Sequence, residues 1–407
     1  MNILLITNNL YPTGGDWTYV TSVADIYQKH GHRVFLWGQK NEKNVYHENE
    51  EFFVGYLDRH GSRNKYLSAF SILKRSIYSK ESFEQLSSFL EEFSIDIAQI
   101  NSINIGLTPS VIEALYVKKI PIVWRILDYK PICPTIHLLR NNKICEDCIG
   151  GKYYKCITRK CKNNSITDSI AVATETYINI RKPYYKHVNV LSFQNYFTRA
   201  VFEKWHFPFL DSCVINNPYS VDAIIPNYTP GDYVLYFGKT EVNKGVMTLI
   251  RSAELNREIK YVIVGVGAQD ELIKAYIKDN KLDNVSFIGP KWGKEMEELL
   301  NNCAFVVVPS EWYEPSPYVI LQTYAHGKTL IASNIGGIPE MIKDGITGLL
   351  FESGNVQELA VKTKTLFSSK NSISEFGKEG RIFVEESFSP ENYYQETMKV
   401  FNKLLDK

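Results

Sequence analysis

Residues 305–348 read FVVVPSEWYEPSPYVILQTYAHGKTLIASNIGGIPEMIKDGITG and contain the strongest structural signal in the chain. The apolar run 305–308 predicts a strand that leads into a loop carrying Glu314. The pair Ser316-Pro317 fits an N-cap and the first position of a helix. A second predicted strand, residues 329–332, runs into a Gly-Gly-x-Pro-Glu loop and another helix start. Two strand ends thus bring a carboxylate and two helix N-termini to one sheet edge, which favours binding of phosphate and sugar.

The motifs of this stretch resemble the donor-binding region of retaining glycosyltransferases of family 4, which have the GT-B fold. In that family a Glu opens a helix, a second Glu follows it, and Gly-Gly-x-Pro-Glu and Asp-Gly-x-Thr-Gly come next. Glu314 matches the first Glu, whereas Gln322 replaces the second. The other matching residues are Gly336, Gly337, Pro339, Glu340, Asp344, Gly345, Thr347 and Gly348. The resemblance implies an α/β protein with two Rossmann-like domains that face each other across a cleft.

The composition is typical of an ordinary soluble protein. The chain has 407 residues, of which 44% are hydrophobic and 22% charged, and its net charge is +1. This length predicts two or three domains, and the near-neutral charge argues against nucleic acid as a partner. Residues 1–12 predict a first buried strand and not a signal peptide, and no apolar run is long enough to span a bilayer. We therefore expect a cytoplasmic protein.

Short apolar runs alternate with helical patterns along the chain, which predicts two doubly wound parallel sheets. The first set of predicted strands comprises residues 3–6, 34–37, 95–100, 121–124, 170–173, 188–191 and 213–215. The second set comprises residues 233–237, 261–264, 285–288, 305–308 and 329–332.

An Asn- and Pro-rich segment around residues 216–230 separates the two sets of strands. We predict one Rossmann-like domain over residues 1–216 and a second over residues 217–388. By the resemblance, the first domain binds the acceptor and the second binds the nucleotide sugar. In GT-B proteins the final helix crosses back to the N-terminal domain, and residues 389–407 are its counterpart here.

Two bases and a pair of glycines fit binding of a diphosphate. A predicted strand ends at Gly238-Lys239, and Lys244 follows at a helix start, where cations suit a diphosphate leaving group. The alternative is that Lys239 and Lys244 are solvated surface lysines. Gly14-Gly15 follows the first strand, and such a loop lets the backbone approach the donor. The alternative for it is a plain turn.

The resemblance implies that Glu314 contacts the hydroxyls of the donor sugar, and a helix cap is the alternative role. Gln322 stands where a Glu normally holds the ribose. A neutral amide gives up a charge-assisted hydrogen bond, so donor affinity is expected to fall while the pocket remains. The remaining predicted donor-binding residues are Ser316, Tyr318 and Val319.

The N-terminal half carries further departures from the family pattern. Leu127 stands where a His is expected, and Asp128 follows it as an acceptor-site carboxylate or a loop cap. Gln99 and Asn101 also occupy places where relatives often have His. These changes remove titratable groups, so a catalytically weakened or inactive glycosyltransferase-like partner or binding protein is the alternative to an enzyme.

Five of the seven cysteines lie between residues 133 and 161. Cys145, Cys148, Cys156 and Cys161 have a spacing that predicts a structural zinc site, because a loop without its own apolar core gains stability from a metal. Reduced, unliganded thiols are the alternative. Some family 4 enzymes carry a similar Cys-rich insertion, here residues 133–161.

A basic segment with an apolar stripe covers residues 59–80. It fits a helix that touches an anionic membrane at the inner face, or equally a helix packed on the core with a solvated basic face.

Together these features predict a retaining glycosyltransferase that moves a sugar from a nucleotide-diphosphate donor to a hydroxyl of a cell-surface glycan or lipid-linked acceptor. The resemblance implies no divalent metal at the reaction centre. The residues expected to act in the reaction are Glu314, Lys244, Lys239 and Asp128. A phosphorylase or epimerase on the same fold is a more distant alternative.

Overall fold

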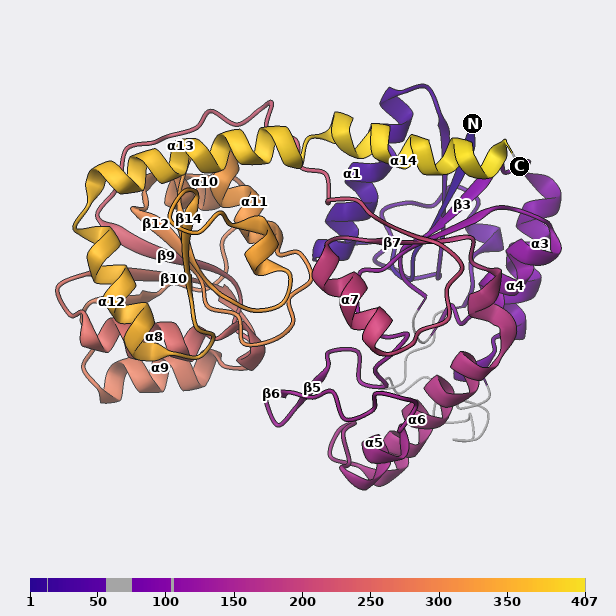
Figure 1. Cartoon of the computed structure of the whole chain (residues 1–407), viewed down its shortest axis with the longest axis horizontal. Helices are drawn as coiled ribbons and strands as arrows, with labels where there is room; N and C mark the ends of the chain where they lie inside the picture. Colours follow the sequence, from indigo (N-terminus) through magenta and orange to yellow (C-terminus); the bar gives the residue numbers. More distant parts are fainter. Residues whose placement is uncertain (13, 56–74, 104–105, 407) are drawn as a thin grey trace. The chain divides into compact units, whose positions relative to one another are not determined.

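The computed structural model describes residues 1–12, 14–55, 75–103 and 106–406 (Figure 1). These residues form two compact units. Unit 1 contains residues 1–138, 145–218 and 390–407, and unit 2 contains residues 139–144 and 219–389. Among the described residues, no helix is both long enough and apolar enough to cross a membrane.

Unit 1 is built on a parallel sheet with strand order β2-β1-β3-β4-β7-β8. Its strands are mostly apolar because helices cover both faces of such a sheet, although β3 and β4 also bury Gln99 and Arg125. The direction of strand addition reverses between β1 and β3, which makes that point of the sheet edge favourable for ligands. The strands are β1 (Asn2–Ile6), β2 (Arg33–Trp37), β3 (Ile97–Ile100), β4 (Ile122–Arg125), β7 (Val190–Phe193) and β8 (Ser212–Val214).

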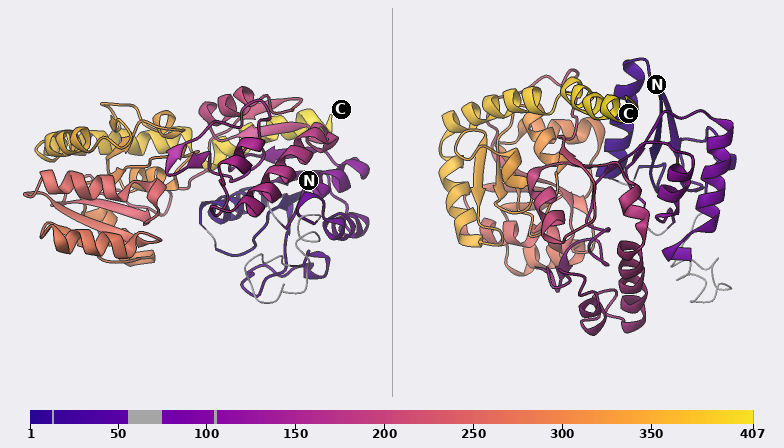
Figure 2. Two further views of the ribbon diagram at one scale, coloured as in Figure 1. Left: turned by 90° about the horizontal axis from the view of Figure 1, so that it is seen from below. Right: turned by 45° about the vertical axis from the view of Figure 1, so that its right-hand side comes forward.

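The helices of unit 1 connect these strands in sequence order (Figures 1 and 2). A small antiparallel hairpin, β5 (Leu139–Arg140) and β6 (Lys143–Ile144), lies within the Cys-rich insertion. The helices and 3-10 turns are α1 (Gly15–Lys29), η1 (Glu50–Phe52), α3 (Lys80–Glu92), α4 (Ser110–Val117), α5 (Tyr154–Thr158), α6 (Ile166–Arg181), η3 (Pro183–His187), α7 (Tyr196–Lys204) and α14 (Pro390–Leu405).

The strand predicted at residues 170–173 is wrong, because these residues lie inside α6. Ser165 caps this helix by accepting a hydrogen bond from the Asp168 amide at 3.2 Å. Val172 and Ala173 are buried on one side of the helix against Tyr153 and Cys156. A short apolar run does not by itself distinguish a buried helix from a strand, and here the cap and the packing favour the helix.

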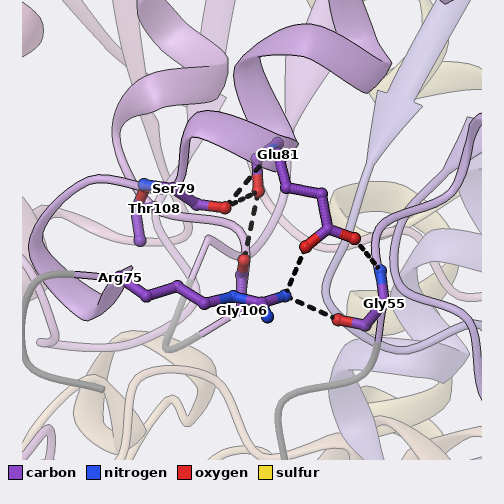
Figure 3. Close-up of polar contacts among 7 residues, drawn as sticks. Gly55, Arg75, Ser79, Glu81, Gly106 and Thr108 are labelled. Carbon is purple, nitrogen blue, oxygen red and sulfur yellow. Dashed lines mark hydrogen bonds and ion pairs between the residues drawn. The ribbon is translucent and has the colours of Figure 1, made fainter. Parts of the chain in front are cut away.

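The start of α3 is held by a set of polar contacts (Figure 3). Glu81 accepts the amide of Gly55 at 2.7 Å and pairs with Arg75 at 2.8 Å. Ser79 caps the helix, and its own amide donates to Thr108 Oγ1 at 2.9 Å. These contacts connect α3 to the segment between β3 and α4.

The C-terminal helix α14 packs on α1 within unit 1 (Figure 1). The hydroxyls of Tyr19 and Tyr393 lie 2.6 Å apart, and the rings of Tyr27 and Phe401 are 5.9 Å apart. Buried aromatic pairs of this kind hold the two helices together although their residues are more than 350 positions apart in the chain.

Unit 2 has a second parallel sheet, with strand order β11-β10-β9-β12-β13-β14. The predicted pair of doubly wound sheets is therefore confirmed. Numbered within this unit, the order is 3-2-1-4-5-6, so the switch point lies between β9 and β12. The strands are β9 (Tyr233–Lys239), β10 (Lys260–Val266), β11 (Val285–Phe287), β12 (Phe305–Val308), β13 (Leu330–Ser333) and β14 (Gly348–Phe351).

Two apolar clusters, built around Phe305 and Tyr324, form the core of unit 2. β14 was not among the predicted strands, because its run is short and directly follows a turn. The helices and 3-10 turns are η4 (Val242–Lys244), α8 (Val246–Leu255), α9 (Asp270–Asp279), α10 (Gly293–Asn302), α11 (Tyr318–Ala325), η5 (Ile338–Met341), α12 (Val356–Phe367) and α13 (Lys370–Ser387).

Candidate functional site

Two loops of unit 2 meet at the switch point of its sheet. One follows β9 and leads into α8, and the other follows β12 and leads into α11. The amide of Glu311 donates to the carbonyl of Asn243 at 2.8 Å, and Thr248 Oγ1 donates to Glu311 Oε1 at 2.5 Å. A Cβ on Gly245 would lie 1.8 Å from the carbonyl oxygen of Pro309, so only glycine permits this approach. These contacts hold the two loops together at the N-terminal end of α8.

Glu314 is the centre of the polar contacts in these loops. The amino group of Lys244 donates to Oε1 at 2.8 Å and to Oε2 at 2.7 Å. Trp312 Nε1 and Ser310 Oγ donate to Oε2 at 2.6 and 3.2 Å. The Glu314 side chain is 9% exposed and that of Lys244 is 25% exposed. The structure thus brings together the predicted acid and one predicted base, at the position where the fold favours a ligand.

The Gly-Gly pair of the Gly-Gly-x-Pro-Glu motif fixes the backbone of Glu314. Gly337 donates its amide to the carbonyl of Glu314 at 2.8 Å. Gly336 has φ +63°, and a Cβ there would lie 2.6 Å from the Glu314 nitrogen. The motif therefore acts through close backbone contact, and it continues into the short 3-10 turn η5.

The Asp-Gly-x-Thr-Gly motif forms the turn into β14. Asp344 Oδ1 accepts the amide of Leu350 at 2.8 Å. Thr347 Oγ1 accepts from Tyr324 at 2.8 Å and from the amide of Lys343 at 3.0 Å. These contacts make the motif a structural support for α11, whose Tyr324 is fully buried.

The predicted start of the next helix needs correction. α11 begins at Tyr318 with Pro317 at the cap position and no capping side chain, so Ser316 is not the N-cap. Ser316 Oγ instead lies 3.7 Å from Met341 Sδ. Pro317 already lacks an N–H, which removes one of the donors that a cap would satisfy.

Glu314 lies in the loop before α11, so it does not share a helix face with Gln322. Gln322 is half-buried on α11. Tyr318 and Val319, the other predicted donor contacts on this helix, form its first turn.

Gly238 and Lys239 end β9 and are exposed. Gly238 has φ +147°, which favours glycine. Next to them, burial raises the pKa of Tyr236 well above its usual range, and the nearby Glu314 and Glu241 add to this rise. Tyr236 thus stays protonated and donates to the Lys239 carbonyl at 2.6 Å.

Gly14, Gly15 and Asp128 belong to unit 1. Gly14 is the cap residue of α1 with φ +123°, and open space lies where its Cβ would be. It lies in the loop after β1, at the switch point of its own sheet. Asp128 Oδ1 accepts the amide of Lys130 at 2.8 Å, which matches the loop-cap alternative.

Leu127 and Asp128 line a recess of unit 1 together with Asn101. Gln99 is buried on β3, where it accepts from Tyr27 at 2.8 Å and donates to Asn101 at 2.8 Å. Gln99 and Asn101 therefore form a neutral hydrogen-bonded network beneath the recess.

None of the four predicted zinc ligands forms a disulfide, and Cys148 lies near Cys145 and Cys161. Burial and the neighbouring Cys133, Cys145 and Cys161 raise the pKa of Cys148 to about 12. Cys145 Sγ donates to Asp147 at 3.3 Å. Within the described part of the chain, no three His, Cys, Asp or Glu side chains take an arrangement that would hold a metal ion. Burial raises the pKa of Cys156 as well, so Cys148 and Cys156 pack as protonated thiols, and zinc stays a prediction.

Two cysteines lie outside the Cys-rich insertion, and the structure describes only part of the basic segment. Cys303 is fully buried, whereas Cys213 is only partly buried. Most of the basic segment 59–80, including Arg59, Arg63 and Lys65, lies outside the described residues.

The sequence analysis did not identify three features of this site: Trp312, Ser310 and the Glu311–Thr248 pair. Each lies within or opposite the loop that carries Glu314. The sequence carried a signal for Trp312, because its indole N–H is a hydrogen-bond donor and lies two residues from the predicted binding carboxylate of Glu314.

Comparisons with known proteins agree with this architecture. Residues 222–383 match the family model "Glycosyl transferases group 1". An uncharacterized glycosyltransferase of Methanocaldococcus jannaschii is 30% identical over 181 residues, which cover 44% of this chain and 51% of that protein. The chain spans about half the length of the curated relatives it matches.

Solved structures match over the whole chain. The sucrose-phosphate synthase of Thermosynechococcus elongatus has a TM-score of 0.73 at 16% identity and is covered to 99%, with 100% of this chain. Anabaena HepE, solved in complex with UDP, has a TM-score of 0.70 at 15% identity, with 99% of this chain and 100% of that chain covered. The chain therefore has the two-domain GT-B fold, and its residues 222–383 are similar to the glycosyl transferases of group 1.

Proposed function

We propose that this protein is a retaining glycosyltransferase that moves a sugar from a nucleotide-diphosphate donor to a hydroxyl of a cell-surface glycan or lipid-linked acceptor. The observation that carries this proposal is the Lys244–Glu314 pair at the switch point between β9 and β12. The family match of this segment and the UDP complex of HepE support a nucleotide sugar as the donor.

Lys244 neutralises part of the negative charge of the donor diphosphate. Its ammonium is paired with Glu314. A diphosphate brings more negative charge than one carboxylate, so it draws Lys244 toward itself, and exposed Lys239 adds a second cation. As the bond between the anomeric carbon and the phosphate oxygen breaks, the acceptor hydroxyl oxygen bonds to that carbon and its proton passes to the departing diphosphate. The two ammonium groups stabilise the remaining charge on that diphosphate.

Glu314 orients the donor sugar. Once Lys244 turns to the diphosphate, the carboxylate is free to accept hydrogen bonds from sugar hydroxyls, while Trp312 and Ser310 keep it in place. In unit 1, Asp128 contributes to binding of the acceptor. We propose a cytoplasmic location, with peripheral membrane contact through residues 59–80.

A non-catalytic homologue is the second candidate. Gln322 and Leu127 replace residues that the family uses, and Asp128 is engaged by its own loop through the Lys130 amide. Such a protein would keep the nucleotide site and lack turnover.

A thermal-shift screen against UDP, GDP, ADP and their common sugars tests the donor site. We expect one nucleotide series to raise the melting temperature in proportion to the logarithm of its concentration. Release of nucleotide diphosphate from the matching sugar donor then separates the two candidates. Stabilisation without release favours the non-catalytic homologue, and a screen with no stabilising nucleotide contradicts both.

A further inference from the structure

Unit 1 contains a recess that the donor site does not use. The loops after β3 and β4 form one side of it, and α6 and η3 form the other. Including the open solvent at its mouth, the recess has a volume of about 430 Å³.

Asn179 on α6 lines this recess with an unused hydrogen-bond acceptor. The residue is 3% exposed, and its Oδ1 is buried without a hydrogen-bond partner. A buried amide oxygen that accepts no hydrogen bond makes the folded protein less stable than one that accepts a hydrogen bond. The group that fits beside it is therefore a small donor, such as a hydroxyl.

The charges around the recess disfavour an anion. Among its described lining residues, Lys130 is the base, and its ammonium is held by Glu175 at 2.7 Å. These two side chains are 12% and 5% exposed, so the pair is largely shielded from water. Asp128 is a further carboxylate in the lining, which leaves a formal charge of −1.

Aromatic groups supply an apolar wall. The rings of Trp124 and Tyr185 lie 5.4 Å apart, and both residues are buried in the lining. A wall with aromatic groups on one side and hydrogen-bonding groups on the other suits a sugar ring, whose faces are apolar and whose edge carries hydroxyls.

The Cys-rich insertion holds the α6 side of the recess in place. Val172 and Ala173 pack on Tyr153 and Cys156, one to two turns before Asn179 on the same helix. A binding group on a helix that is fixed by a packed module is preorganised, so less free energy is spent on ordering it.

We propose that this recess binds an uncharged sugar ring of the acceptor, with one hydroxyl donating to Asn179 Oδ1. The proposal rests on the function proposed above, since it identifies the class of acceptor: a neutral, hydroxyl-bearing sugar and not a uronic acid or sugar phosphate. Asn179 is then a residue that determines acceptor specificity.

The test measures binding of free sugars to the full chain by saturation-transfer NMR. The probes are the methyl glycosides of glucose, galactose and mannose, compared with methyl glucuronoside and glucose 6-phosphate. We expect at least one neutral glycoside to bind and both anions to bind at least about tenfold more weakly. In Asn179→Leu, binding of that glycoside should weaken about tenfold, the effect of losing one buried hydrogen bond.

The matched control is Asn402→Leu, at an exposed position on α14 of the same unit. It should leave glycoside binding unchanged. Asn179→Leu removes an unpaired buried oxygen, so it should fold at least as well as the parent, and its melting temperature checks this. Nucleotide-induced stabilisation should be the same in both variants.

The outcomes separate this proposal from the proposed function. Nucleotide binding without any glycoside binding would show that the recess holds a water only, and the donor site would stand. Equal or tighter binding of the anions, or glycoside binding that Asn179→Leu does not weaken, would also overturn the proposal. Glycoside binding lost in Asn179→Leu, in a protein that no nucleotide stabilises, would keep the recess and reject the transferase.

Discussion

The ammonium of Lys244 bridges both carboxylate oxygens of Glu314, at 2.8 and 2.7 Å. Because the two residues come from the loops that follow β9 and β12, the pair lies at the switch point of the unit 2 sheet. Under the proposed function, binding of a diphosphate exchanges one charge-assisted contact of Lys244 for another, and Glu314 then accepts hydrogen bonds from the sugar.

Lys244→Gln should lose nucleotide-induced stabilisation. It should also lower the free energy of unfolding by about 2 kcal/mol, because Glu314 is left without its charged partner. Lys260→Gln is the control, since Lys260 forms an ion pair with Asp232 in which both side chains are about 70% exposed. Titration of both variants with nucleotide, followed by thermal unfolding, checks this. Full nucleotide stabilisation in Lys244→Gln would contradict the placement of the diphosphate.

Glu314→Gln should separate the two parts of the donor. It frees Lys244, so the nucleotide diphosphate should bind at least as well as before. The nucleotide sugar should lose any advantage over the bare diphosphate, because a neutral amide accepts weaker hydrogen bonds from hydroxyls. Calorimetric titration with both ligands measures the difference. An unchanged preference for the sugar nucleotide would remove Glu314 from sugar binding.

Gly336→Ala should destabilise unit 2 more than Gly345→Ala does. Both glycines have positive φ, +63° and +73°, so each alanine carries a backbone cost of about 1–2 kcal/mol. Only at Gly336 would the added Cβ also meet the backbone of Glu314, whereas nothing lies within 4 Å of it at Gly345. Melting temperature and nucleotide titration report the difference. Equal effects of the two substitutions would show that the Glu314 loop moves aside without loss.

Gln322→Glu should tighten nucleotide binding if this position contacts the ribose. A charge-assisted hydrogen bond contributes about 1.5–3 kcal/mol when well placed, which is roughly tenfold or more in affinity. In a pocket already shaped around Gln, the new carboxylate would be unpaired, and binding would stay flat or weaken. Titration of parent and variant with the same nucleotide distinguishes these results.

Acid should destabilise unit 2 through His326. Burial lowers the pKa of this side chain from its ordinary value of 6.5, and Nδ1 lies 2.8 Å from Asn301 Oδ1. The unfolded chain therefore binds more protons at this site, so stability falls as the pH drops through about 6.5 and below. His326→Gln should show a shallower loss between pH 7.5 and 5 than the parent. His47→Gln, at a side chain that is 59% exposed, should follow the parent.

Zinc analysis decides between the two states of the Cys-rich insertion. We expect about one zinc per chain in protein purified without chelator, because metal binding releases thiol protons and draws the gathered sulfurs together. Cys148→Ser should then lower the zinc content and destabilise α5 and α6, whereas Cys213→Ser should retain the metal. A zinc content near zero would establish the free-thiol state.

Local patterns in the sequence were enough to predict both sheets. Continuous apolar runs such as Phe305–Val308 mark strands covered on both faces, and this signal needs no knowledge of distant residues. The same signal failed at residues 170–173, where the apolar run lies on the inner side of α6. The prediction of an N-cap at Ser316 was also wrong, because the position of the cap depends on where the backbone enters the helix.

By itself, the sequence determined the two doubly wound sheets and the loops at their strand ends, because alternation of strand and helix is a short-range property. Only the tertiary structure decided that Lys244 meets Glu314 across 70 residues of chain, that Trp312 and Ser310 complete the contacts, and that α6 places Asn179 in a recess. These contacts follow from the order of strands in each sheet, and that order is set by long-range packing that no local pattern contains.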